Sequence, residues 1–437
     1  MVIFWFRRDL RLNDNAGLYY ALKENPEVQP IFIFDTVILN DLKNRSDRRV
    51  DFIHQSLQHL KNQLRALNSD ILVLKGNPVE VFKKLAEDYP LKAVYTNHDY
   101  EPYAIERDNK VAQLLKSRGI VFKTIKDQCI FEKEEIVKDD GHPYTVFTPY
   151  SKKWKEKCTP FYYKPYPVSK YFDSLKKSEE VLYFPSLEEI GFHRTDITFS
   201  PPSDPDPELL RMYKDRRDFP GTDGTTRLSV HLRFGTVSIR HLVSLAMRQK
   251  AETWLNELIW REFFMMLLYF FPHTVHSCYR RAFDNLPWEN DLEKFEKWKT
   301  GNTGIPIVDA GMRELLHTGY MHNRVRMITA SFLVKNLLID WRWGEAWFAQ
   351  HLNDFDLSAN VGNWQWAAST GCDAAPYFRI FNPIEQQKKF DPDYLYIEKW
   401  VPEWNTASYP KPVVDLKTSR EKAIKVYQAT SKLSRGF

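Results

Sequence analysis

The sequence has few cysteines and no long apolar run, and both absences narrow the kinds of protein it can be. Four of its 437 residues are cysteines (Cys129, Cys158, Cys278 and Cys372), far apart and without a CxxC pair. This spacing argues against a disulfide framework and a zinc knot and favours a reducing cytoplasm. No stretch approaches the roughly 20 apolar residues of a membrane span. The N-terminal MVIFWFRRDLRL has its arginines after the apolar run, which is not typical of a secretory signal.

Two common nucleotide-binding signatures are also missing. Neither GxGxxG nor GxxxxGK[ST] occurs, so the sequence supports neither a dinucleotide-binding fingerprint nor a P-loop. No His/Glu pattern beside the paired carboxylates completes a metal site, and we predict no metal. With 43% hydrophobic and 27% charged residues, the composition is that of a soluble folded protein, and the length indicates two or three domains.

The first 130 residues alternate between short apolar runs and amphipathic stretches. Runs typical of buried strands lie at 2–6, 31–35, 71–74, 93–97 and 120–125, and helical spacing lies at 47–66, 78–89 and 103–118. Strands that alternate with helices indicate a parallel, Rossmann-like sheet covered on both faces, so we predict an α/β domain over 1–130. Ligands on such sheets bind at the strand carboxyl ends, which here are followed by Arg7, Arg8, Asp9, Asp35 and Asn97.

Residues 131–207 have a different character. Ten prolines fall between Pro143 and Pro207, with little periodicity, which indicates a long connector on the surface of a domain. Beyond it strand signals disappear and helical spacing recurs at 208–217, 238–248, 252–271, 291–299, 307–317, 323–340, 344–352 and 419–432. We therefore predict an all-helical domain over 208–437.

Basic residues and tryptophans are concentrated in particular regions. Between Arg211 and Arg248, eight Lys/Arg stand against three Asp, and a second basic excess begins at Lys411. A surface for polyanions such as nucleic acid and an ordinary solvated face both explain this distribution. Eleven of the thirteen tryptophans fall from Trp254 onward, which indicates stacking, redox chemistry or a very aromatic core.

A glycine-rich segment, 221–229, carries the first candidate binding residues. It joins a turn to the hydroxyls of Thr225, Thr226 and Ser229, just before a helical stretch. Backbone N–H groups freed by glycine, together with these hydroxyls, suit a pyrophosphate. An ordinary helix-capping turn has the same features and remains the alternative.

A second segment, 254–264, is more specific. Residues three, four and seven apart share a helix face, and this face would carry Glu257, Trp260, Arg261 and Phe264. A carboxylate, an indole and a guanidinium placed together can clamp a planar polar ring, by accepting hydrogen bonds, stacking and holding phosphate. A core tryptophan beside a surface ion pair is the alternative.

A third segment combines two carboxylates, an amide and two indoles, namely Asp354, Asp356, Asn360, Trp364 and Trp366. In a helix Trp364 and Trp366 would point about 200° apart, so that they serve different surroundings. One can face a buried ligand while the other faces a cavity.

Two further indoles, Trp288 and Trp341, stand alone in the sequence. Each is most simply a core residue. A line of oxidisable rings from a buried redox centre to the surface is the alternative, since long-range electron transfer proceeds by short hops.

These residues belong to long motifs that resemble the photolyase/cryptochrome family over nearly the whole chain. The motifs lie at 4–15, 217–229, 254–264, 319–345 and 354–383, from FWFRRDLRLNDN to DFDLSANVGNWQWAASTGCDAAPYFRIFNP. Within the family, the sequence is similar to class I cyclobutane pyrimidine dimer photolyases.

The resemblance implies an antenna-type α/β domain, a linker and a helical domain that binds FAD. It implies FAD contacts for Tyr213, Thr225, Thr226, Arg227, Leu228, Ser229, Trp254, Asp354, Phe355, Asp356 and Asn360. The hydroxyl cluster would lie at the pyrophosphate, and Asn360 at the flavin N5. An amide there donates a hydrogen bond without offering an acidic proton, which favours the reduced form, FADH⁻.

The resemblance also implies light-driven repair of DNA by a lyase. Trp364, Trp341 and Trp288 match an electron-transfer chain from the flavin to the surface. The lesion pocket is matched by Glu257, Trp260, Asn323, Met327 and Trp366, and a DNA phosphate surface by Arg217, Arg324 and Arg326. A pyrimidine dimer would flip into this pocket, accept one electron and split, with Glu257 stabilising its radical anion.

The rival within the family is a cryptochrome-type blue-light receptor. Glu257, Trp260, Met327 and Trp366 all match the dimer-repairing pattern, and Asn360 stands where plant-type receptors have aspartate. We also expect no long C-terminal tail of the kind that many receptors use. The segment MHNRVRM (321–327) lacks the histidine pair of (6-4) photolyases, which argues against that class. A non-enzymatic DNA-binding module would need neither the flavin-binding residues nor the line of tryptophans.

The resemblance does not identify a second, antenna chromophore. Folate-binding relatives have an Asn-Glu pair where Tyr103 and Ala104 stand here, which argues against folate. A deazaflavin, a flavin and an empty site remain open. We expect a monomer that binds no membrane and acts on nucleoid DNA in a prokaryote-like cytoplasm.

Overall fold

The computed structural model describes residues 1–433 and divides into two compact units, each built from separate segments of the chain. Unit 1 comprises Met1–Glu135, Trp154–Asp204 and Leu228–Arg248, and unit 2 comprises Ile136–Lys153, Pro205–Arg227 and the chain from Gln249 onward. The domain boundaries at 130 and 207 stay predictions, and the last four residues of the predicted domain 208–437 lie outside the described residues.

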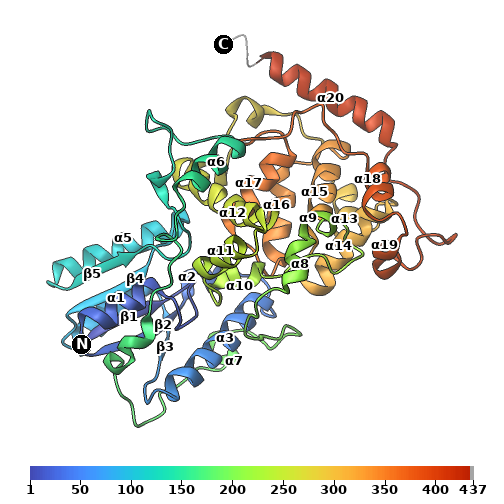
Figure 1. The fold of residues 1–437 in the computed structure, drawn as a ribbon. Helices are drawn as coiled ribbons and strands as arrows, with labels where there is room; N and C mark the ends of the chain where they lie inside the picture. The colour runs from blue at the N-terminus through green and yellow to red at the C-terminus, as the bar shows by residue number, and fades with distance from the viewer. Residues whose placement is uncertain (434–437) are drawn as a thin grey trace. The chain divides into compact units, whose positions relative to one another are not determined.

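Unit 1 contains a five-stranded parallel sheet, which confirms the predicted fold class (Figure 1). Its strands are β1 (Val2–Phe6), β2 (Val28–Asp35), β3 (Leu72–Gly76), β4 (Ala93–Asn97) and β5 (Val121–Ile125), in the order β3-β2-β1-β4-β5. β1, β2 and β4 are apolar along nearly their whole length because both of their faces are buried.

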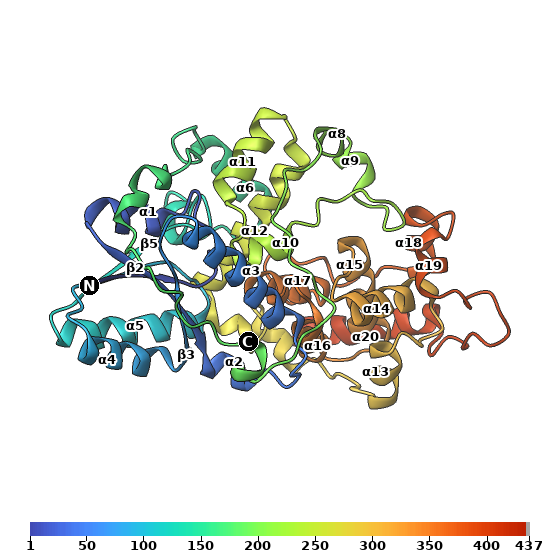
Figure 2. The same cartoon turned by 90° about the horizontal axis from the view of Figure 1, so that it is seen from below.

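Helices cover both faces of this sheet. One face carries α1 (Ala16–Glu24) and α3 (Arg48–Arg65) on residues such as Phe4. The other face carries α4 (Pro78–Asp88) and α5 (Pro102–Ser117), which lie side by side in Figure 2, on residues such as Trp5. The shorter helices of unit 1 are α2 (Thr36–Asp41), η1 (Lys133–Glu135), η2 (Val168–Ser174), α7 (Leu187–Ile190), α10 (Ser229–Phe234) and α11 (Ile239–Arg248).

The proline-rich segment is more than a surface connector. Val168, Leu175, Leu187 and Ile190 are buried in the core of unit 1, beneath the same sheet face as α1 and α3. The segment also contains α6 (Phe147–Lys157), whose first residues belong to unit 2. Its apolar residues contribute to the core although their spacing follows no helical or strand period, and this is why periodicity alone did not reveal them.

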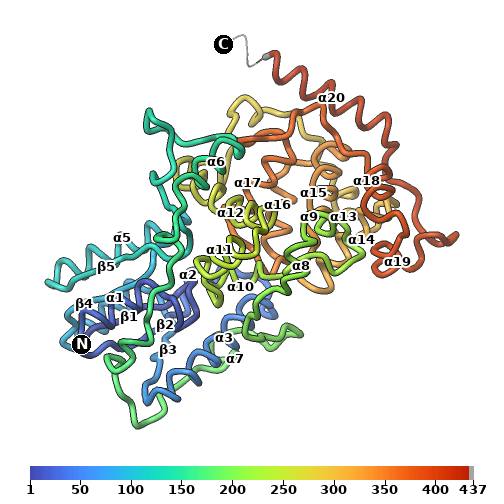
Figure 3. Tube along the Cα trace, viewed as in Figure 1, coloured from blue at the N-terminus to red at the C-terminus, as the bar shows by residue number. Residues whose placement is uncertain are grey.

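The described part of unit 2 contains helices and no strand, as predicted. The helices that build the site are α12 (Glu252–Phe270), α14 (Pro306–Thr318), α15 (Asn323–Ser331), α16 (Trp341–His351) and α17 (Leu357–Ala367), followed along the trace in Figure 3. The others are α8 (Pro207–Arg211), α9 (Tyr213–Arg216), η3 (Pro272–Val275), η4 (Arg281–Asn285), α13 (Leu292–Lys299), α18 (Pro383–Phe390), α19 (Leu395–Trp400) and α20 (Leu416–Leu433).

The helix predicted over 323–340 ends earlier than its periodicity indicates. The α-helical geometry stops at Ser331 and continues as a π-helical segment, η5 (Phe332–Asn336). A π turn inserts an extra residue and rotates the side chains that follow. Lys335 is consequently buried, and its ammonium donates to Ser369 Oγ at 2.8 Å and lies 3.5 Å from the centre of the Tyr427 ring.

Candidate functional site

A cavity of about 100 Å³ lies within unit 2, between α15, α16 and α17. It brings together nine of the residues that the sequence singled out, namely Asn323, Arg326, Met327, Asp354, Phe355, Asp356, Asn360, Trp364 and Trp366. Residues predicted to contact FAD and residues predicted to contact a DNA lesion therefore line the same cavity. We refer to it below as the unit 2 cavity.

The start of α17 fixes the amide and the first indole of this cavity. Asp356 caps the helix, because its Oδ1 accepts hydrogen bonds from Ala359 N at 3.2 Å and from the Ser358 hydroxyl. Asn360 and Trp364 are four residues apart and share a helix face. The Trp364 ring packs directly on Gly344 of α16, where an added Cβ would lie 2.2 Å from Cη2.

Asn360 is bonded to a carboxyl that the sequence did not single out. Its Nδ2 donates to Glu345 Oε1 at 2.8 Å and to the Glu345 carbonyl at 3.1 Å. Burial raises the pKa of Glu345, and the hydrogen bond from Asn360 only partly offsets this. Both amide hydrogens are thus used within the protein, and the amide oxygen is the group left for a ligand. The donation to a flavin N5 stays a prediction.

Arg326 and Asp354 form an ion pair at the edge of the cavity. Arg326 Nη2 lies 2.9 Å from Asp354 Oδ2, and its Nε donates to the Met321 carbonyl at 2.7 Å. Arg324 is likewise paired, with Asp218 at 2.9 Å. A DNA phosphate would have to compete with these carboxylates, so the phosphate-binding role of the arginines stays a prediction.

The predicted face of α12 exists and carries a second ion pair. Glu257 Oε1 accepts a hydrogen bond from Arg217, whose guanidinium also lies over the Tyr213 ring, 5.5 Å from its centre. Burial raises the pKa of Glu257, and the charge of Arg217 opposes that shift. The carboxyl is therefore held in place by a cation while remaining half-buried. Arg261 is half-buried on the same helix, and Trp254 is buried.

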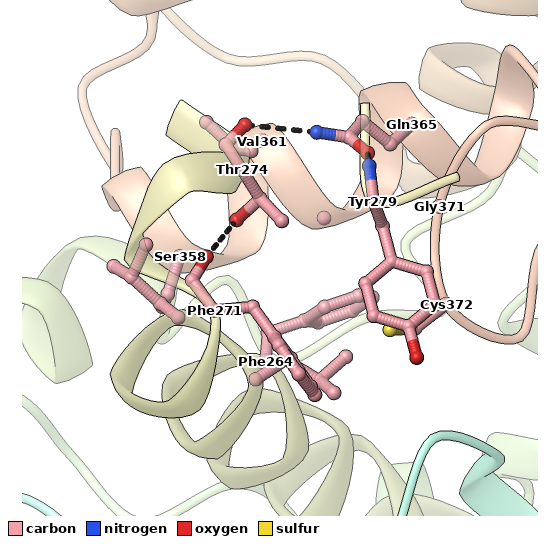
Figure 4. A pocket seen from close by; sticks show the side chains of 12 residues that line it. Phe264, Phe271, Thr274, Tyr279, Ser358, Val361, Gln365, Gly371 and Cys372 are labelled. Atoms are coloured by element: carbon pink, nitrogen blue, oxygen red, sulfur yellow. Dashed lines mark hydrogen bonds between the residues drawn. The ribbon is translucent and has the colours of Figure 1, made fainter. Parts of the chain in front are cut away.

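Phe264, the last residue of this face, lines a separate small cavity instead. The cavity has a volume of about 30 Å³ and lies between α12 and α17 (Figure 4). Gly362 lets the two helices approach, because an added Cβ would lie 2.2 Å from Phe264 Cδ1. Gln365 Nε2 donates to the Thr274 carbonyl at 2.8 Å, and its Oε1 accepts from Tyr279 N at 2.8 Å. This cavity is a consequence of how α17 is anchored and offers little to a ligand.

The glycine-rich segment divides between the units. Thr225, Thr226 and Arg227 belong to unit 2, and Leu228 and Ser229 belong to unit 1, where Ser229 begins α10. Within unit 2, the Thr225 hydroxyl lies 3.5 Å from the Tyr320 hydroxyl. The predicted role of the Thr225, Thr226 and Ser229 hydroxyls at a pyrophosphate stays a prediction.

Of the three tryptophans of the predicted electron-transfer chain, only the one predicted to lie at the surface is partly exposed, and the order of the chain stays a prediction. Trp364 and Trp341 are buried, at 2% and 0% exposure, and Trp288 is half-buried. One indole was missed, since Trp298 is fully buried with its ring centre 6.1 Å from that of Trp364. It stands in a charged helix, FEKWK, where no pattern in the sequence indicates its partner.

Unit 1 has its own group of polar residues where ligands of parallel sheets bind. This strand-end cluster consists of Trp5, Arg7, Asp35, Tyr103, Arg107 and Asp108. Arg7 and Arg107 lie over the Trp5 ring, 4.8 and 5.0 Å from its centre, and both bind Asp108, at 2.6 and 2.9 Å. The Tyr103 hydroxyl donates to Asp35 at 2.7 Å, and burial, followed by this bond, raises the pKa of Tyr103. The charges of the cluster are mutually neutralised.

Among the described residues, no group of three or more His, Cys, Asp or Glu could hold a metal ion, and no helix is long and apolar enough to cross a membrane. Two family models match the chain, "DNA photolyase" over residues 2–170 and "FAD binding domain of DNA photolyase" over residues 254–408.

Curated relatives and solved structures resemble the chain over most of its length. A deoxyribodipyrimidine photo-lyase from Synechococcus is 39% identical, over 92% of this chain and 88% of its own length. The solved structure of an archaeal photolyase from Sulfolobus tokodaii with two FAD molecules is 36% identical, with a TM-score of 0.86 over 98% of this chain and 99% of that one. A Synechocystis cryptochrome is 27% identical, with a TM-score of 0.84 over 98% and 99%. The chain therefore belongs to the DNA photolyase family.

Proposed function

We propose that the protein splits cyclobutane pyrimidine dimers in DNA with the energy of light, in the manner of a class I photolyase. The observation that carries this proposal is the unit 2 cavity, in which Asn360 and Trp364 lie together with Met327 and Trp366. A cofactor and a lesion that bind in one cavity come close enough for direct electron transfer. The photo-lyase relatives support the same substrate.

The residues of the cavity fit a flavin. Phe355 and Trp364 offer flat apolar surfaces, and Asp356 and the free amide oxygen of Asn360 offer acceptors for ring and ribityl donors. A reduced FAD held by these residues would supply light-driven transfer of one electron to the dimer, which is returned once the two C–C bonds of the cyclobutane ring are broken. The protein's part is to hold the ring, exclude water and keep the half-buried Glu345 as the partner of Asn360.

The lesion side of the site binds and orients the dimer. Trp260 and Trp366 provide stacking surfaces for its bases, and such stacking contributes about 1–3 kcal/mol per base. A dimer already disrupts base stacking, so that moving it out of the duplex costs less than for an intact base. Glu257, held by Arg217, accepts hydrogen bonds from the dimer and stabilises its radical anion.

The experiment that tests this proposal follows thymine absorbance. Purified, reduced protein is mixed with oligothymidine that carries cyclobutane dimers, and absorbance is recorded under blue light and in the dark. We expect recovery of thymine absorbance in the light only. No recovery by protein that contains reduced FAD would contradict dimer repair.

A signalling function of the cryptochrome type is the second candidate, and the Synechocystis cryptochrome favours it. It predicts light-dependent flavin chemistry without repair in the same assay. Monomeric protein and FADH⁻ as the resting cofactor also belong to the proposal, and size-exclusion chromatography and the flavin spectrum of protein purified without oxygen test them.

A further inference from the structure

The indole of Trp260 is backed by Phe147, a residue that the proposed function does not use. Phe147 is the first residue of α6, and its ring lies flat on Trp260, with ring centres 3.7 Å apart and planes 3° from parallel. Aromatic pairs usually adopt offset or edge-to-face arrangements, so this close overlap covers one face of the indole almost completely. Phe264 also stacks on Trp260, with ring centres 5.5 Å apart and planes 27° from parallel, so a base that stacks on Trp260 has the part of the indole that the two phenylalanines leave uncovered.

Phe147 is anchored by its ring and by its backbone. The ring meets Phe263 edge-on at 5.8 Å, and Phe263 is fully buried. One turn further along α6, Tyr150 is 1% exposed, and its ring packs against that of Phe263 with the ring centres 5.1 Å apart. The backbone N–H of Phe147 donates to Asp373 Oδ2 at 3.0 Å. Phe147 is therefore held in place from several sides, which argues against a side chain that a ligand displaces.

Asp373, which holds the backbone of Phe147, lies a few residues along the chain from Trp366, the second indole of the proposed lesion site. Trp366 lies in the last turn of α17, and the chain between it and Asp373 contains Ser369. Ser369 and Asp373 both have left-handed backbones, with φ of 63° and 47°. Few residues other than glycine adopt this conformation, so the course of the loop is specific. The chain thus leads from Trp366 to Asp373, and the contacts of Asp373 with Phe147 and of Phe147 with Trp260 continue the connection.

We propose that Phe147 is a positioning residue for lesion recognition, which fixes the Trp260 indole and its spacing from Trp366. The inference rests on the proposed function, in which both indoles contact the dimer. Two covalently joined bases form one rigid body, whereas two normal bases stack independently. Surfaces at a fixed spacing therefore favour the dimer over undamaged DNA.

The test is the ratio of two affinities in Phe147→Leu, which keeps an apolar side chain and removes the flat ring. Affinity is measured by fluorescence anisotropy for a dimer-containing oligonucleotide and for the undamaged oligonucleotide of the same sequence. We expect the preference for the dimer to fall about two- to twelvefold, which corresponds to the energy of one aromatic pair. Phe147→Tyr should restore it, and Phe270→Leu, the same change at the end of α12, should leave it unchanged.

Asp373→Ala provides a second route if Phe147→Leu folds poorly, because it removes the backbone anchor and leaves the ring. It should lower the same ratio by a smaller factor. An unchanged or increased ratio in both variants overturns the positioning role, and an increase would identify Phe147 as a plug that the lesion displaces. Equal weakening for both oligonucleotides, with loss of FAD absorbance, would show a merely structural role. If the wild-type protein itself does not prefer the dimer, the proposed function fails first.

Discussion

The strand-end cluster of unit 1 and the unit 2 cavity contain the same kinds of residue and use them differently. In the cluster, Arg7 and Arg107 share Asp108, and both guanidinium groups lie over the Trp5 indole. In the cavity, Trp364 and the amide oxygen of Asn360 face open space. The charges of the cluster neutralise one another, although the Trp5 indole N–H is buried without a hydrogen-bond partner, whereas the cavity leaves the amide oxygen of Asn360 for a ligand.

This difference shows that a polar residue at an expected ligand position is not, by itself, evidence that a ligand binds there. Buried charges are stable when they are paired, so a fully paired cluster is explained by stability alone. Groups left without partners beside flat rings need another explanation, and a bound cofactor or lesion provides one. We therefore expect changes in the cavity to affect photochemistry and binding, and changes in the cluster to affect stability.

The largest expected effect concerns the tryptophan line. Trp341→Phe should abolish photoreduction of oxidised FAD while repair by enzyme that is already reduced continues, because the indole is needed only to refill the flavin. Flavin absorbance under blue light measures the first and thymine absorbance the second. Trp298→Phe is the matched control, since Trp298 is as buried as Trp341 and its ring centre lies 6.1 Å from that of Trp364. If Trp298→Phe blocks photoreduction and Trp341→Phe does not, the assignment of Trp341 to the electron-transfer chain is wrong.

The next effect is on the stability of unit 1. Arg107→Ala should lower the free energy of unfolding by about 3–5 kcal/mol, because it leaves the buried Asp35 carboxylate without its cation, while Asp108 keeps Arg7. Denaturant unfolding measures the change, and repair by the folded fraction should stay at the wild-type level. Lys110→Ala, on the same helix in an exposed pair with Glu106, should change little. Loss of repair at unchanged stability would show that the cluster acts directly in the reaction.

Removal of the stacking surface should have a smaller energetic effect. Trp260→Ala should weaken binding of dimer-containing DNA by about 1–3 kcal/mol, the contribution of one stacked base. Trp404→Ala is a suitable control, because Trp404 is half-buried and stacked on Tyr394 at 4.4 Å, and it lines neither cavity. Equal affinity of wild-type and Trp260→Ala protein for the dimer, measured by anisotropy, would remove Trp260 from the lesion site.

The smallest effect concerns Glu345, whose pKa is raised by burial above its ordinary value of 4.5. A raised carboxyl pKa means that the folded state binds the proton more tightly, so stability is lost as the pH rises from the unfolded value through the folded one. Glu345→Gln keeps an acceptor for Asn360 and removes this loss. Its melting temperature should exceed that of the wild type at neutral pH and equal it near pH 4. The exposed Glu293→Gln should show no such pattern, and a pH-independent difference at Glu345 would contradict the assignment.

Much of the fold could be predicted from the sequence, for identifiable reasons. The strands at 2–6 and 93–97 are short apolar runs, and α12 has a clear helical period, so local patterns were sufficient there. The π-helical segment after Ser331 and the buried residues of the proline-rich segment depend on distant contacts, and no local pattern predicts them.

The same limit applies to the site. The motifs indicated Asn360 and Trp260, whose residue types are suited to cofactor or base contacts. They did not indicate Glu345 or Phe147, because neither the end of the motif 319–345 nor a phenylalanine in a proline-rich stretch shows which residue the side chain contacts. Only the three-dimensional contacts, such as the flat ring pair with Trp260, reveal that they support the residues found first.

Hydrogen exchange on binding of dimer-containing DNA tests the central claim most directly. The account predicts slower exchange in 323–331 and 357–367, the helices that line the unit 2 cavity, relative to undamaged DNA of the same sequence. It predicts no such difference in 97–108, which carries part of the strand-end cluster. Dimer-specific protection at 97–108, with none in the two helices, would contradict the account.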